Sequence, residues 1–76
     1  SYARIAIHHK NVPNMVGQIS SILAKENLNI SDMLNKSKGN YAYTLIDVDS
    51  EVSEQAVNNL LAIQEVIRVR IIKGDK

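Results

Sequence analysis

Residues 8–15 read His-His-Lys-Asn-Val-Pro-Asn-Met, and the spacing of the hydrophobic residues changes across this stretch. Before it, residues 2–8 alternate between two faces, one of them lined by alanine and isoleucine, which is the period of a β-strand. After it, residues 13–26 place hydrophobic side chains three and four positions apart, which is the period of an amphipathic helix. The stretch therefore predicts a strand, a short loop and a helix in succession.

The loop residues also suggest where this helix begins. Pro13 suits the first helical turn, because its missing N–H would have no partner there in any case. We therefore expect Asn11 or Val12 to be the N-cap, a position that asparagine favours. Asn27 and Asn29 follow the last turn, and asparagine tolerates the left-handed backbone that ends many helices.

Farther along the chain, the hydrophobic periods predict three more strands and a second helix. We expect, in order, strands at 30–37 and 41–49, a helix at 51–62 and a strand at 66–72. A hairpin turn at 38–40 joins the first two, with Gly39 available for a positive φ. The strand at 41–49 is apolar on both faces, so it lies in the interior of the sheet, or one of its faces is covered by something beyond the helix layer. In the last strand, simple alternation puts Val66 on the same face as Arg68.

The order of these elements, β-α-β-β-α-β, predicts an α+β fold of the ferredoxin-like type. Right-handed crossovers place both helices on one face of a four-stranded antiparallel sheet. The first and third strands are then central, and the second and fourth are edges open to pairing with another chain. We expect residues 1–76 to form a single domain, cut from a larger protein because the sequence begins with serine rather than methionine.

The composition narrows the classes of function. The chain has 76 residues, a formal net charge of +1 and no cysteine. A nearly neutral charge makes no strong case for nucleic acid or for an anionic membrane. Without cysteine there is neither a disulfide framework nor a thiolate metal site. We see no signal peptide and no run of about 20 apolar residues, and we expect a cytoplasmic domain.

Two adjacent histidines raise the question of a metal site. Successive residues of a strand point to opposite faces, so His8 and His9 cannot easily bind one ion together. We expect no metal here, and we expect His8 to be an exposed strand residue. The sequence also has no Ser-His-Asp arrangement and no phosphate-binding loop, so we expect no catalytic residue in this domain.

The tyrosines raise the alternative of RNA binding. In RNA-binding modules of this topology, aromatic residues on the first and third strands stack bases. The relevant residues are Tyr2, Tyr41 and Tyr43, with Arg68 and Arg70 on the last strand. However, the chain has neither Phe nor Trp, and the third strand lacks the Lys/Arg-Gly-Phe signature of those modules. We therefore expect no nucleic-acid partner, and we expect the tyrosines to be buried at a sheet face or a domain interface.

Two asparagines lie where an amino acid could be captured. Asn11 precedes the first helix and Asn29 precedes the second strand. An asparagine side chain can accept a hydrogen bond from an ammonium group and donate one to a carboxylate. The two loops lie at opposite ends of the helix, so only a symmetric partner could bring the two side chains together. The alternative is that Asn11 caps the helix and Asn29 is a turn residue.

The chain resembles the ACT domain, an amino-acid-sensing module attached to many metabolic enzymes. The residues that carry the resemblance are 7–14, 28–30, 41–48 and 66–70. Within this family the chain most resembles the C-terminal regulatory domains of D-3-phosphoglycerate dehydrogenases. That resemblance implies an allosteric domain that binds L-serine between two subunits of a homodimer, paired side by side into one continuous sheet.

The resemblance also implies which residues hold the effector. His9, Asn11 and Asn29 match the family's effector-binding positions, and Ile30 and Asn14 neighbour them. Where the family commonly has glycine, this chain has Asn14, whose side chain would narrow the pocket. No cofactor is expected in this domain, and NAD would be bound by the catalytic part of the parent enzyme. Two alternatives stay open, namely the ACT domain of an L-serine dehydratase and an ACT domain that only mediates dimerisation.

Overall fold

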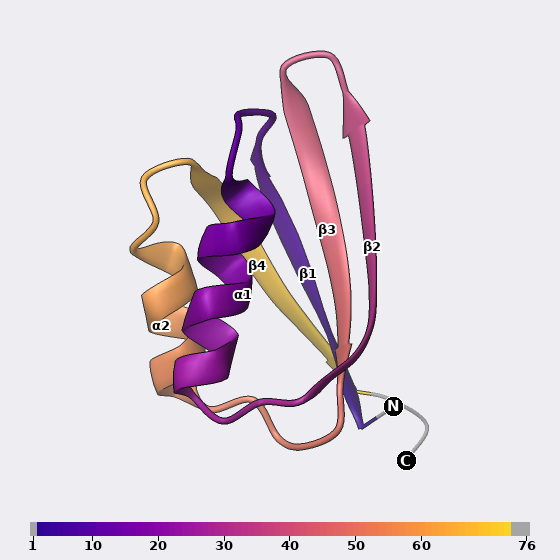
Figure 1. The fold of residues 1–76 in the computed structure, drawn as a ribbon, viewed down its shortest axis with the longest axis vertical. Helices are drawn as coiled ribbons and strands as arrows, with labels where there is room; N and C mark the ends of the chain where they lie inside the picture. Colours follow the sequence, from indigo (N-terminus) through magenta and orange to yellow (C-terminus); the bar gives the residue numbers. More distant parts are fainter. Residues whose placement is uncertain (1, 74–76) are drawn as a thin grey trace.

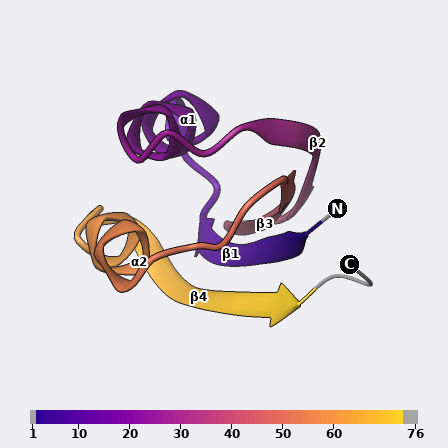
Figure 2. The same cartoon turned by 90° about the horizontal axis from the view of Figure 1, so that it is seen from below.

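The computed structural model describes residues 2–73, which form six elements in the predicted order (Figure 1). The elements are β1 (Ala3–Lys10), α1 (Met15–Lys25), β2 (Ile30–Lys38), β3 (Tyr41–Val48), α2 (Glu54–Leu61) and β4 (Val66–Lys73). The four strands form one antiparallel sheet with the order β2-β3-β1-β4. Both helices lie on the same side of that sheet (Figure 2). The ferredoxin-like prediction, with β1 and β3 central, is confirmed.

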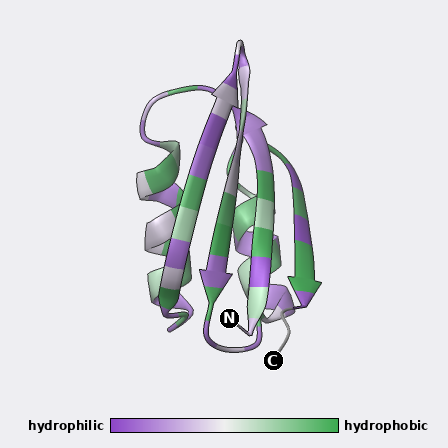
Figure 3. Cartoon of the chain, turned by 90° about the vertical axis from the view of Figure 1, so that its right-hand side faces the viewer, coloured by the Kyte–Doolittle hydropathy of each residue, from purple (hydrophilic) through white to green (hydrophobic). Residues whose placement is uncertain are grey.

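The core lies between the sheet and the two helices. Alternate residues of β1 and β3 face the helices, and they include Ile5, Ile7 and Ile46, which are fully buried. The helices meet them with residues three to four positions apart, as their periods predicted. These are Met15, Ile19 and Leu23 from α1 and Ala56 and Leu60 from α2. The other side of the sheet is uncovered, and its strands alternate between hydrophilic and hydrophobic bands (Figure 3).

Helix α1 begins two residues later than predicted, and its cap is different. Its N-cap is Asn14, with a left-handed backbone at φ 67°. The prediction of Asn11 or Val12 as cap is therefore wrong. The reason is that both residues are held in the loop beyond β1 by other bonds: the Asn11 N–H donates to the Asn40 carbonyl at 2.9 Å, and the Val12 N–H donates to the Lys10 carbonyl at 2.9 Å. At the other end, Asn27 has the expected left-handed backbone, with φ 60°.

Helix α2 also begins later than its hydrophobic pattern suggested, at Glu54 instead of residue 51. The start is fixed by Ser53, whose hydroxyl accepts a hydrogen bond from the Ala56 N–H at 3.1 Å. A serine at this position satisfies one of the backbone donors that a helix start leaves unpaired. The hairpin turn between β2 and β3 is confirmed, and Gly39 has φ 63°.

Strand β4 departs from simple alternation at its first residues. Arg68 pairs with His8, but His9 pairs with Val66, so Ile67 is an extra residue in a β-bulge. The bulge returns Val66 to the helix side of the sheet, where it packs against the core. The prediction that Val66 shares a face with Arg68 is therefore wrong.

Candidate functional site

His9 lies at the end of β1 and is buried against the helix side of the sheet, with only 2% of its surface exposed. Its Nδ1 lies 2.9 Å from the Lys10 carbonyl oxygen, and its Nε2 lies 2.9 Å from Oγ1 of Thr44. A backbone carbonyl can only accept, so Nδ1 carries a proton. The ring is therefore held at both nitrogens, and it fixes the direction in which the chain leaves β1.

The hydroxyl of Thr44 extends this contact across the sheet. It lies 3.0 Å from the side-chain oxygen of Asn35 on the edge strand β2. One hydroxyl proton cannot be donated to both neighbours. When the His9 ring is neutral, Thr44 donates to Nε2, and it can then accept from Asn35 only if that amide is turned so that its NH₂ group faces Thr44. When the ring carries both protons, Nε2 donates to Thr44, which donates to Asn35. A hydrogen-bonded chain thus links buried His9 to the exposed edge of the sheet.

Asn11 holds the β1–α1 loop against the hairpin turn between β2 and β3. Its side-chain Nδ2 donates to the Gly39 carbonyl at 3.1 Å, next to the backbone hydrogen bond that Asn11 makes with Asn40. Its side chain is otherwise exposed to solvent. His9 and Asn11 therefore lie at the same end of the molecule, and both are positioned by contacts that cross from β1 to the β2–β3 hairpin.

Asn14 covers the first turn of α1. A Cβ atom added at Gly17 would lie only 2.5 Å from Oδ1 of Asn14, so the asparagine side chain folds over the glycine. The two residues line a shallow hollow of about 430 Å³ on α1, together with Gln18, Ser21 and Ile22. We call His9, Asn11 and Asn14 the loop cluster.

Asn29 and Ile30 lie at the other end of α1. The Asn29 side chain donates to Oδ2 of Asp49 at 2.8 Å, and Ile30 opens β2, where it pairs with Val48. Helix α1 has 11 residues, which corresponds to a length of about 16 Å. As the topology predicted, one chain therefore keeps Asn29 apart from the loop cluster.

No protein-family model matches the chain. The D-3-phosphoglycerate dehydrogenase of Escherichia coli strain K12 is 29% identical to it over 66 residues, which cover 84% of this chain but only 16% of the dehydrogenase. The ACT domain from the GTP pyrophosphokinase of Chlorobium tepidum superposes with a TM-score of 0.77 over 92% of this chain and 95% of that chain, at 19% identity.

The chain has the fold of an ACT domain. A further structure that resembles it is the regulatory subunit of aspartate kinase from Thermus thermophilus, with a TM-score of 0.68 and 16% identity over 91% of this chain and 50% of that chain. At these identities the solved structures establish the fold alone.

Two residues of this chain matter to the loop cluster but were missed by sequence reasoning. Thr44 reads as an ordinary strand residue, and Asn35 reads as a polar residue of an edge strand. Their connection to His9 depends on strand register, since Asn35 pairs with Thr44 in the β2–β3 hairpin. Counting back from the two-residue turn would have placed Asn35 opposite Thr44, but not His9 beside them.

The tyrosines and His8 also differ from expectation. Tyr41 is 58% exposed and Tyr43 is half-buried, so neither is buried at the sheet face within this chain, and burial at a domain interface stays a prediction. His8 is half-buried rather than exposed, because its ring packs edge-on against Tyr43 with 4.9 Å between the ring centroids.

An ion pair that the sequence did not reveal joins β1 to β3. Nε of Arg4 lies 2.7 Å from Oδ1 of Asp47, its partner in the strand register. The hydrogen bond from Arg4 lowers the pKa of Asp47 below its ordinary value of 3.8.

Among residues 2–73, no three potential metal ligands gather, and no helix is long and apolar enough to cross a membrane.

The ion pair predicts a difference in acid stability between the wild-type chain and Asp47→Asn. A carboxylate whose pKa is lower in the folded state stabilises the fold above its unfolded pKa and loses that contribution as the pH falls through its folded pKa. We therefore expect Asp47→Asn to be less stable than wild type at about pH 6, with the gap closing below about pH 4. The effect should be small because Arg4 is half-exposed. Urea unfolding at several pH values measures it, and a gap that widens in acid would contradict it.

Proposed function

We propose that this ACT domain is an allosteric sensor of L-serine and the regulatory part of a D-3-phosphoglycerate dehydrogenase. One observation carries the proposal: His9 and Asn11 come together at one end of α1, while Asn29 lies at the other, in the arrangement that a two-fold partner would complete. The 29% identity to the dehydrogenase over 66 residues supports the choice of effector and of parent enzyme. In that protein, a catalytic domain outside this chain would bind NAD.

The geometry favours pairing through the edge strand β2. Helix α1 lies on the β2 side of the molecule and α2 on the β4 side (Figure 2). A two-fold axis at the β2 edge reverses the strands and sets α1 antiparallel to the α1 of the partner. The N-terminal end of each helix, which carries Asn11, then meets the C-terminal end of the other, which carries Asn29. Continuous sheet pairing would also cover the unpaired backbone of β2.

The two halves of such a site have complementary chemistry. Near Asn29 lies the carboxylate of Asp49, which can accept a hydrogen bond from the ammonium group of an amino acid. The amide of Asn11 can donate to its carboxylate or to the hydroxyl of serine. His9 can reach the ligand only by exchanging one of its two internal hydrogen bonds, so its larger part is to hold the loop in position. Serine regulates the enzyme if it favours one global arrangement by about 1–3 kcal/mol.

Calorimetric titration with L-serine tests the proposal, with glycine, D-serine and L-phenylalanine as competitors for specificity. We expect saturable binding that is selective for L-serine and lost in Asn29→Ala. Asn58→Ala is the matched control, because Asn58 is an exposed asparagine on α2. Sedimentation in the same buffer should show a dimer. Heat from L-phenylalanine but not L-serine would reject serine as the effector.

An ACT domain that only dimerises is the second candidate, and Asn14 is the observation that favours it. Its side chain occupies the start of the α1 hollow, where the family resemblance places a glycine. A stable dimer that gives no heat with any amino acid would support this candidate.

For the serine-dehydratase alternative, the deciding observation is the sequence that flanks the domain, since a dinucleotide-binding fingerprint and an iron–sulfur cysteine set are readily distinguished.

Replacing Asn14 with glycine should strengthen serine binding. Glycine adopts φ 67° without the steric cost that a side chain imposes, and it empties the space above Gly17. We expect tighter L-serine binding and a free energy of unfolding within about 1 kcal/mol of wild type. Asn14→Asp, which keeps the size of the side chain, should not share the gain. Calorimetry of both variants checks this, and weaker binding by Asn14→Gly would show that the Asn14 side chain contacts the ligand.

A further inference from the structure

The side of the sheet away from the helices carries a strong excess of positive charge. The strand register places six basic side chains on this side, namely Arg4, Lys10, Lys36, Lys38, Arg68 and Arg70. The acidic side chains of the strands on this side are Asp32 and Asp47. Within the strands, the excess on this face is therefore four positive charges, although the whole chain has a formal net charge of only +1. The compensating negative charges lie elsewhere on the molecule, so the net charge of the chain does not reveal the excess on this face.

The charges on this face are also separated along the strands. Asp32 and Asp47 lie in one row across the sheet, at the end where Arg4 forms its ion pair with Asp47. The remaining basic residues lie toward the hairpin end, with no acidic residue on the described strands among them. These five, Lys10, Lys36, Lys38, Arg68 and Arg70, define what we call the basic half-sheet. The nearest carboxylate outside the strands is that of Glu65, which immediately precedes β4 and whose backbone carbonyl accepts a hydrogen bond from the Lys10 N–H. The half-sheet therefore keeps an excess of positive charge.

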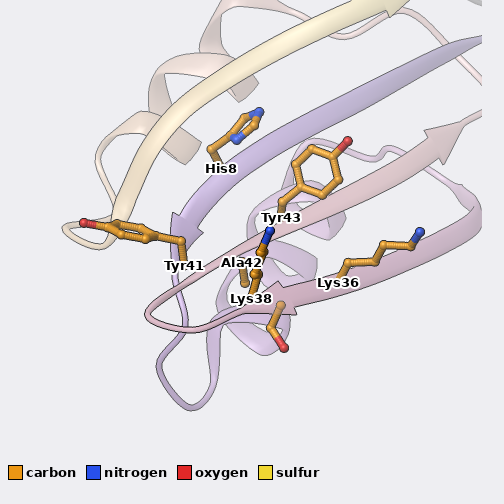
Figure 4. A pocket seen from close by; sticks show the side chains of 7 residues that line it. His8, Lys36, Lys38, Tyr41, Ala42 and Tyr43 are labelled. Atoms are coloured by element: carbon orange, nitrogen blue, oxygen red, sulfur yellow. The ribbon is translucent and has the colours of Figure 1, made fainter.

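Three rings lie within the basic half-sheet. The His8 and Tyr43 rings, from neighbouring strands, pack edge to face at 63° and project on the same side (Figure 4). Tyr41 lies two residues from Tyr43 on β3, about 7 Å along the strand, and is 58% exposed. A hollow of about 430 Å³ lies among these rings, Lys36 and Lys38, and an adjoining one of about 240 Å³ reaches Arg68.

We propose that the basic half-sheet binds single-stranded nucleic acid, with bases stacked on Tyr41, Tyr43 and His8 and phosphates held by the surrounding lysines and arginines. Rings on the two central strands of an open four-stranded sheet, flanked by cations, are what base stacking on such a surface requires. Four of these residues lie side by side on the four neighbouring strands, in the order Lys36, Tyr43, His8 and Arg68. Together they extend about 14 Å across the sheet.

Other occupants fit this surface less well. A second copy of the chain, laid face to face and antiparallel, would set five basic residues against Asp32 and an Asp47 already paired with Arg4. An acidic peptide would use the charges but not the rings. Side-by-side pairing through β2 would leave this face open, so the proposal stands independently of serine sensing.

Fluorescence anisotropy with a labelled single-stranded RNA of about 10 nucleotides tests the proposal, using the chain of residues 1–76. The logarithm of the binding constant should fall with the logarithm of salt concentration with a slope of about −2 to −3.5, for three to five phosphate contacts. Lys36→Gln and Arg68→Gln should each reduce the magnitude of this slope by about 0.7. Lys25→Gln, on helix α1, is the matched control and should leave it unchanged. The absence of binding at low salt would overturn the proposal.

Substitution of the rings distinguishes nucleic acid from other polyanions. Tyr43→Leu should weaken RNA binding about 5- to 150-fold without changing the salt slope, because stacking and not charge is lost. Tyr43→Phe should bind like wild type, which also controls for folding. Tyr2→Leu, just before β1, should have no effect. If Tyr43→Leu binds like wild type while polyglutamate or phosphatidylserine vesicles compete as well as RNA, the surface serves an acidic partner and the proposal fails.

Discussion

Mixing two variants that each fail to bind serine, Asn11→Ala and Asn29→Ala, is expected to restore binding. In the proposed dimer each site takes Asn11 from one chain and Asn29 from the other. A mixed dimer therefore has one site that lacks both asparagines and one site that is intact. If the chains associate at random, half of the dimers are mixed and about a quarter of all sites should bind.

The mixing experiment requires that the chains exchange, so the two variants are refolded together from urea and compared with each variant refolded alone. Calorimetry should then give a stoichiometry of about one site in four, with an affinity close to that of wild type. Recovered binding would show that the site spans two chains, which simple loss of function cannot show. If the mixture binds no serine although sedimentation finds mixed dimers, Asn11 of one chain and Asn29 of the other do not form one site.

Thr44→Val is expected to lower the free energy of unfolding by about 1–3 kcal/mol, which is a large share of the stability of so small a domain. Valine has nearly the same shape as threonine, but it leaves Nε2 of His9 buried without a partner. The cost is the desolvation of that nitrogen and not a loss of packing. Urea unfolding of the two proteins measures the difference.

Two further variants separate this cause from others. Thr44→Ser keeps the hydroxyl and should lose only the contribution of one buried methyl, about 0.8 kcal/mol. The double replacement His9→Leu with Thr44→Val removes both polar partners and should recover much of the stability lost in Thr44→Val alone. If Thr44→Val is as stable as wild type, the His9 ring has another partner when the hydroxyl is absent.

The fold could be predicted from the sequence because its signals are local. The change of hydrophobic period across residues 8–15 separates β1 from α1, and Gly39 marks the hairpin turn. Once six elements are placed in order, they match the split βαβ motif, whose first and third strands are central, and the handedness of crossovers places both helices on one face. The cap of α1 could not be predicted in the same way, because the Asn11 N–H is bonded to the carbonyl of Asn40, which is 29 residues away in the sequence and close only in the fold.

The functional surfaces could not be predicted in the same way, because they depend on strand register, which is set by residues far apart in the sequence. Whether Val66 or Ile67 faces the helices is decided by the bulge opposite His9, and both residues are equally suited to a strand. The network from His9 to Asn35 and the basic half-sheet both require knowing which residues lie side by side on neighbouring strands. Composition alone, with its net charge of +1, argued against a charged surface that the register then revealed.

The contact between Asn14 and Gly17 has a consequence for how this sequence can change over time. Because the asparagine side chain occupies the space that a Cβ at position 17 would need, a larger residue at position 17 requires the exposed side chain of Asn14 to move aside. A chain with glycine at position 14 can accept alanine or serine at position 17, whereas a chain that keeps asparagine at position 14 cannot do so without moving that side chain. Among relatives, a larger residue at position 17 should therefore be found together with a small one at position 14.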